Sequence, residues 1–345
     1  MKRFIISACV FGSAVVGYSN PLQAQIDDRA GTAAMEELLV PVTPRSVALG
    51  NALTSGLSGA SAVESVQSNP AAAVTNTGTQ AMFSRMEYLL DVGVNYFGVS
   101  QRFGNNVIGL SVNAWDYGDI LETDESINPD PVSGVTYTAN ATVIGASLAR
   151  QFTDRISAGF TVKGIGRSIA DANAYGVALD AGMTYVVGET GLRFGVSLKN
   201  FGTKHQFGGS DLEQPITVEG PDGTLLIVGS PDIQSDELPS QLNFGAAYTR
   251  QFAQGLSATV LTNFSSNAYD LDRYAGGLEL GYQNILYIRG GFDLSSDPGV
   301  NAWSDWNVGG GVVLPVSSVG LAIDYAYRPT EVFEGVHMYS VNVTL

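Results

Sequence analysis

The residues with the most chemistry to offer in this chain are two histidines, His205 and His337, and one cysteine, Cys9. A zinc site needs three or four clustered His, Cys or carboxylate ligands, and a serine nucleophile needs a histidine base within hydrogen-bond reach. The histidines are far apart in the sequence, no cysteine accompanies them, and no His-x-x-x-His spacing occurs. We therefore expect no metal site, no cofactor and no catalysis. For an enzyme, Ser240 or the acidic segments near His205 would be the place to look.

Carboxylates are concentrated in two long segments, 118–139 and 202–239. The first has no Lys or Arg, and Lys204 is the only Lys or Arg of the second. Such segments usually form a solvated surface. Calcium-assisted ordering and docking of a basic partner domain are two further hypotheses, because both use clustered carboxylates. The candidate docking residues of the second segment are Asp211, Glu213, Glu219, Asp222, Asp232, Asp236 and Glu237.

The N-terminus has the layout of a secretory signal peptide. Lys2 and Arg3 precede an apolar run from Phe4 to Tyr18, and Ala24 supplies the small residue at the cleavage position. This run is shorter than the roughly 20 apolar residues of a membrane-spanning helix. The sequence therefore predicts a signal peptide (1–24), a plug or periplasmic segment (25–79) and a β-barrel (80–345). Because Cys9 would be removed with the signal, we expect no disulfide in the mature chain.

From about residue 80 onward, apolar residues alternate with small or polar ones, which is the period of strands with one apolar face. The segment 175–187 shows it over thirteen positions, from Tyr175 through Leu179 to Val187. In a soluble sandwich the apolar face would be the core. Here the opposite face holds Gly, Ala, Ser, Thr and Asn, which suits the lumen of a barrel whose apolar face meets lipid. The run Gly309 to Gly311 falls within a strand and is interpreted as a thin lumen wall, not a phosphate loop.

The strand count and the connections predict an all-β, 14-stranded antiparallel transmembrane β-barrel with a short, partly helical N-terminal segment. Fourteen is an even number, as in bacterial single-chain barrels, and after the second strand short and long connections strictly alternate. No window approaches 18 consecutive apolar residues, which excludes a helical membrane protein. A net charge of -16 argues against nucleic-acid binding.

Strand register predicts two charge pairs in the lumen. If apolar residues of neighbouring strands share one face, the turn at 188–191 places Asp180 opposite Lys199. By the same rule, the turn at 283–285 places Glu279 opposite Arg289. Opposite charges are tolerated in a wet lumen, and we interpret both pairs as braces of the barrel wall.

The segment before the first strand carries a recognisable signature. Arg45 begins an R-x-x-x-L-G-x-A run that includes Gly50, and Asn69-Pro70-Ala71 forms a turn just before the first strand. This pattern resembles the FadL-like barrels, and over nearly the full length the chain is most similar to their PorV/PorQ branch. It departs from the usual N-P-A-G at Ala72. The further segments that carry the resemblance are 85–99, 198–204, 238–239, 277–291 and 324–327.

The resemblance implies a barrel of the outer membrane with the N-terminal segment folded within or beneath it. The PorV branch implies a non-catalytic component of type IX secretion, with a large translocon barrel, secreted cargo C-terminal domains and outer-membrane lipid as partners. The FadL branch implies the alternative, a channel that passes hydrophobic small molecules through the lumen and a lateral gap. We expect the secretion role and keep the hydrophobic-solute channel as its alternative.

Overall fold

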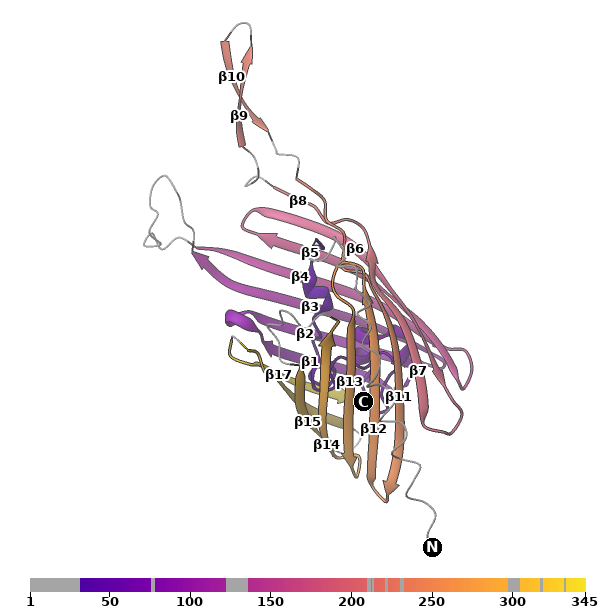
Figure 1. Ribbon diagram of the computed structural model, residues 1–345. Helices are drawn as coiled ribbons and strands as arrows, with labels where there is room; N and C mark the ends of the chain where they lie inside the picture. The colour runs from indigo at the N-terminus through magenta and orange to yellow at the C-terminus, as the bar shows by residue number, and fades with distance from the viewer. Residues whose placement is uncertain are drawn as a thin grey trace, which may run out of the picture.

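The alternating segments form fourteen strands that pair into one closed antiparallel sheet. The computed structural model describes residues 32–75, 78–121, 136–209, 212, 214–220, 223–229, 233–296, 305–316, 319–331 and 333–345. Neighbours follow chain order, and pairing of the first strand with the last closes the barrel (Figure 1). The expected signal peptide lies outside the described residues. The barrel strands are β1 Thr79–Glu87, β2 Gly93–Phe103, β3 Asn106–Leu121, β4 Thr136–Gln151, β5 Ile156–Ile169, β6 Ala172–Val186, β7 Leu192–Gly202, β11 Gln241–Ala253, β12 Leu256–Asn267, β13 Arg273–Tyr282, β14 Leu286–Ser295, β15 Trp306–Val316, β16 Val319–Arg328 and β17 Val336–Thr344.

The barrel is apolar outside and polar inside, the reverse of a soluble protein. In β13, the outward Leu278 and Leu280 are each 43% exposed, whereas the inward Glu279 between them is 5% exposed. In β12, Thr259 and Asn263 are buried in the lumen and Val260 faces out. The predicted fold class is therefore confirmed. None of the described helices is long and apolar enough to cross a membrane.

The connections match the expected alternation with one exception. Short turns join β2 to β3, β4 to β5, β6 to β7 and the later pairs at the end of the barrel where the chain terminates, which we call the inner end. At the opposite, outer end, β5 and β6 are joined by Ala170 and Asp171 alone, so strict alternation was wrong there. The two strands keep pairing up to Ile169 and Ala172, and a turn with Ala170 at φ 51° leaves no loop.

The long 202–239 segment is not a plain loop. It contains β8 (Phe207–Gly208), which pairs with β6, and a hairpin of β9 (Gln214–Gly220) and β10 (Gly223–Gly229). Figure 1 shows this hairpin projecting away from the barrel at the outer end. An isolated two-stranded hairpin has little stability of its own, so this element contributes little to the barrel.

The N-terminal segment folds inside the barrel, where Figure 1 shows its indigo helices enclosed by strands. We call residues 32–75 the plug. Pro44 stands in the first turn of its first α-helix, where a missing N–H is harmless, and Gly50 follows that helix at φ 65°. Ser61 caps the second α-helix by accepting from the Glu64 N–H at 3.1 Å. The plug elements are η1 Glu36–Leu39, α1 Pro44–Ala48, α2 Ala62–Ser68 and η2 Pro70–Thr75, and η3 Leu89–Asp91 joins β1 to β2.

Candidate functional site

A buried group of five charged side chains ties the plug to the barrel wall. Arg289 Nε lies 2.6 Å from Glu279 Oε2, in the register expected from the sequence, and Arg289 Nη1 lies 2.5 Å from Asp324 Oδ1. Arg45 of the plug joins them, with Nη1 3.2 Å from Glu64 Oε2 and Nη2 3.7 Å from Asp324 Oδ2. We call Arg45, Glu64, Glu279, Arg289 and Asp324 the ion cluster. Its two guanidinium groups face three carboxylates, so loss of either arginine would leave a large buried negative charge.

The second expected charge pair is different in the structure. Asp180 Oδ2 lies 2.6 Å from Lys163 Nζ of β5, and among the described residues no ion pair joins it to Lys199. The register of β6 and β7 shifts between Leu179 and Ala181, because a bulge sets Lys199 and Asn200 against Asp180. Asn200 N donates to Asp180 Oδ1 at 2.8 Å and Lys163 Nζ donates to Asn200 Oδ1 at 2.8 Å. Lys199 thus faces Asp180 across the two strands as expected, together with Asn200, but the ion pair of Asp180 is with Lys163 on the other neighbouring strand.

Glycines on the inner face of the wall let the plug backbone approach the strands directly. A Cβ at Gly195 would lie 2.7 Å from Ser55 Cα, and one at Gly277 would lie 2.8 Å from the Leu49 carbonyl oxygen. Such distances are not tolerated, and backbone cannot move aside as a flexible side chain can. Several of these glycines pair directly across neighbouring strands. At two further glycines, Gly182 and Gly309, a Cβ would instead meet a side chain of the plug. We call the whole set the glycine track: Gly159, Gly182, Gly195, Gly245, Gly277, Gly291 and Gly309.

The Asn69-Pro70 turn is fixed on this track. Asn69 Nδ2 donates to the Thr54 carbonyl at 2.8 Å and to the Met183 carbonyl of β6 at 3.2 Å. A Cβ at Gly182 would lie 2.8 Å from Asn69 Cγ. The four signature residues thus act in docking: Arg45 through charge, Gly50 through its left-handed backbone against Phe292, and the turn through hydrogen bonds to the wall.

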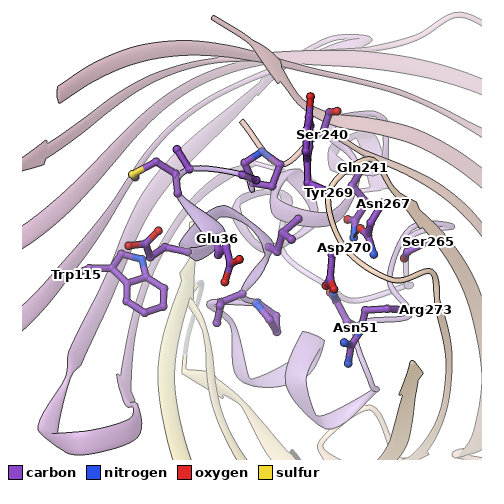
Figure 2. A pocket seen from close by; sticks show the side chains of 18 of the residues that line it. Glu36, Asn51, Trp115, Ser240, Gln241, Ser265, Asn267, Tyr269, Asp270 and Arg273 are labelled. Atoms are coloured by element: carbon purple, nitrogen blue, oxygen red, sulfur yellow. Dashed lines mark hydrogen bonds between the residues drawn. The ribbon is translucent and has the colours of Figure 1, made fainter. Parts of the chain in front are cut away.

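Between the plug and the outer end of the barrel lies a cavity of about 680 Å³. One side is aromatic: the rings of Tyr88 and Trp115 meet edge to face at 5.3 Å, and Tyr117 stacks beside Trp115 at 6.3 Å. Figure 2 shows Trp115 on one side of this cavity, polar side chains on the opposite side, and Glu36 between them. The polar side chains labelled there are Asn51, Ser240, Gln241, Ser265, Asn267, Asp270 and Arg273.

The charged groups of the cavity are largely paired with one another. Arg167 Nη2 lies 3.3 Å from Glu37 Oε1, and Tyr117 donates its hydroxyl to the same carboxylate. Arg273 Nε lies 2.9 Å from Asp293 Oδ1. The cavity is therefore a half-aromatic, half-polar chamber, a combination suited to small ligands.

The candidate docking carboxylates divide into three groups. Asp236 makes a backbone bridge with His205, and Glu237 accepts from the Tyr269 hydroxyl, so both help to build the cavity roof. Glu219 belongs to β9. Asp211, Glu213, Asp222 and Asp232 lie outside the described residues. Among the described residues, no group of three His, Cys, Asp or Glu is placed to hold a metal ion.

His205 lies under the roof, 2% exposed, near Arg167, Glu37 and Asp236. Burial is the largest effect on this ring, and it lowers its pKa below the ordinary 6.5. Because the folded pKa is the lower one, the stabilisation from a neutral His205 is complete above pH 6.5 and is lost as the pH falls from there through the folded pKa. We expect the melting temperature to drop between pH 7.5 and 5.0 by less in His205→Gln than in the natural chain, as followed by circular dichroism. An equal drop in both proteins would contradict this.

Sequence reasoning missed the glycine track and the aromatic wall. The track had a signal, since its glycines occupy inward positions of the alternation, where Ser, Thr or Asn would otherwise stand. The aromatic wall of the cavity had no signal in the sequence, because Tyr88 and Trp115 become neighbours only through the pairing of β1, β2 and β3.

Comparisons with known proteins support the fold. No protein-family model matches the sequence, and a search of curated proteins finds no match. The structure resembles the CymD monoaromatic hydrocarbon channel, with a TM-score of 0.57, 13% identity, and coverage of 89% of this chain and 97% of that one. For the Pseudomonas putida toluene transporter TodX, the TM-score is 0.52 and the identity 14%, with coverage of 88% of this chain and 98% of that one. For a Pseudomonas aeruginosa FadL homologue, the TM-score is 0.52 and the identity 11%, with the same coverage of 88% of this chain and 98% of that one. These three structures are named as a channel, a transporter and a FadL homologue.

Proposed function

We propose that this chain is an outer-membrane channel for the uptake of small hydrophobic molecules. The observation that carries the proposal is the 680 Å³ cavity with its aromatic wall, held between the plug and the outer end of a 14-stranded barrel. Solved barrels of the same fold are named as hydrocarbon channels and toluene transporters. This supports the alternative kept from the sequence over the type IX secretion role. The PorV/PorQ relationship, the translocon and the cargo domains stay predictions from the resemblance.

The exterior of the barrel supports a place in a membrane. Aromatic rings face outward near both rims, which is where they sit at membrane interfaces. At the inner rim, Arg150 and Arg250 lie over the rings of Phe152 and Phe252 at 5.6 and 5.8 Å, with charges able to reach lipid headgroups. Outer-membrane lipid is therefore the proposed environment. Outward aromatics mark the inner rim at Phe103, Tyr248 and Tyr282, and the outer rim at Tyr175, Tyr274 and Trp306.

Uptake of labelled toluene tests the proposal in a bacterial host that lacks its own hydrocarbon channels. We expect cells with this barrel to take up toluene several-fold faster than cells without it. Ser240→Trp, which fills the cavity from the connection before β11, should return uptake towards background. Ala258→Trp puts the same side chain on the outer face of β12 and should leave uptake unchanged. Uptake equal with and without the barrel contradicts the proposal. Loss of secreted proteins on deletion of the gene, with normal toluene uptake, would support the secretion role instead.

A further inference from the structure

The outer face of the barrel carries the same short motif twice at the inner rim. The sequence Arg-Gln-Phe stands at the inner ends of β4 and β11, at 150–152 and 250–252. In both copies the arginine and the phenylalanine are two positions apart, so they share one face of the sheet. Phe152 is 61% and Phe252 is 63% exposed, and the guanidinium groups of Arg150 and Arg250 lie 5.6 and 5.8 Å from the ring centres. The wall therefore presents two exposed sites with the same geometry.

The charges of these two arginines are not compensated within the described part of the chain. Arg289, inside the barrel, contacts two carboxylates. The carboxylates of the turns next to β4 and β11, Asp154 and Glu189, are exposed, and among the described residues no ion pair joins them to Arg150 or Arg250. A phenylalanine ring attracts a guanidinium and holds it in place, but it carries no net charge. Each arginine therefore keeps its positive charge available to an anion from outside the protein.

The two ends of the barrel differ in charge. Near the inner turns, the described charges that are not buried are five arginines, with Asp154 and Glu189 as the only carboxylate side chains. The two long outer segments, 118–139 and 202–239, are rich in carboxylates and contain a single Lys or Arg. An anionic membrane surface attracts clustered basic side chains that lie at its level. The inner rim therefore fits such a surface, and its five arginines are Arg102, Arg150, Arg155, Arg193 and Arg250.

We propose that Arg150 and Arg250 each bind the headgroup of an anionic glycerophospholipid in the inner leaflet of the outer membrane. The short turns identify this end of the barrel as the periplasmic one. A guanidinium matches a phosphate with two parallel hydrogen bonds, and the exposed phenylalanine ring offers an apolar surface to the start of the acyl chains. A zwitterionic headgroup has the same phosphate, but its ammonium group is repelled by the arginine. The inference rests on the outer-membrane location in the proposed function and adds a partner to it.

Native mass spectrometry of the full chain in detergent tests the two sites, with phosphatidylglycerol and phosphatidylcholine of identical acyl chains as probes. We expect the natural chain to bind two molecules of phosphatidylglycerol, each about 2- to 5-fold more tightly than phosphatidylcholine, the gain of one exposed ion pair. Arg150→Gln should lose this preference at one site, and the double variant with Arg250→Gln should lose it at both. Arg155→Gln is the matched control, because it removes the same charge from an exposed position of the neighbouring turn and should preserve the preference.

Equal affinities of the natural chain for the two lipids would overturn the proposal. So would a preference that survives in the double variant, or that falls as much in Arg155→Gln as in Arg150→Gln, because the overall charge of the rim and not the two sites would then be responsible. Unchanged heat-modifiable migration of each variant in electrophoresis shows that the barrel still folds. The proposed function fails separately, when toluene uptake by cells does not depend on the barrel at all.

Discussion

Replacing Arg45 by Met should release the plug and open the barrel to ions. Arg45 contacts Glu64 within the plug and Asp324 in the wall, and its loss leaves three buried carboxylates with Arg289 alone. Breaking a buried ion pair by removing one partner typically costs about 3–5 kcal/mol. We expect Arg45→Met to lower the free energy of unfolding, measured in urea, by about 3–5 kcal/mol. In planar bilayers we expect a marked rise in single-channel conductance.

Two further variants separate charge from packing. Arg155→Met removes an exposed arginine from the inner turn between β4 and β5 and should change neither measurement. Adding Glu64→Gln to Arg45→Met restores the original net charge of the ion cluster, and should recover part of the lost stability. An Arg45→Met barrel that is as stable and as closed as the natural one would show that the ion cluster does not hold the plug.

Adding one methyl group to the glycine track should displace the plug without changing any charge. In Gly195→Ala and Gly277→Ala the new Cβ would stand within 3 Å of plug backbone. Overpacking of this kind costs about 1–3 kcal/mol per site, so a variant with both changes should lose the docked plug. The measurement is limited trypsin digestion, because cleavage after Arg45 requires the plug to leave the wall.

Gly109→Ala is the matched control for the glycine track. Gly109 also faces the lumen from a strand, but a Cβ there would meet its nearest atom at an ordinary 3.6 Å. We expect it to resist trypsin like the natural chain. Plug cleavage that is equally slow in the double variant and in Gly109→Ala would mean that the wall tolerates side chains at the track.

The barrel was predictable from the sequence because its physics is local. In each strand, the alternation of apolar and polar residues shows which face meets lipid. The register of Glu279 and Arg289 follows from the length of one short turn. The same rule placed Lys199 opposite Asp180, but it compared one pair of strands at a time and so did not reveal the ion pair of Asp180 with Lys163 on the strand at its other side. The β9–β10 hairpin had a signal in the Pro-Asp-Gly sequence between two apolar runs, which is typical of a turn, but the acidic composition around it favoured a loop.

The functional site was less predictable, because it is assembled from distant parts of the chain. The signature at Arg45 and Asn69 indicated that the N-terminal segment has a specific role. No pattern close to it in the sequence predicts that Glu279, Asp324 and Gly182 contact it. The cavity depends on the same long-range closure, because Trp115 and His205 line it from elements far apart in the sequence. The resemblance predicted the fold, whereas the proposed channel role draws on the enclosed cavity and on the names of solved barrels with the same fold.

The position of Arg45 has a consequence for biogenesis. Its wall partners Glu279 and Asp324 belong to β13 and β16, which leave the ribosome long after Arg45 itself. Contacts so distant along the chain form late, after the intervening segments have been ordered. The plug is therefore translated before the wall that holds it, and it can reach its native place only after the last strands of the barrel have been made.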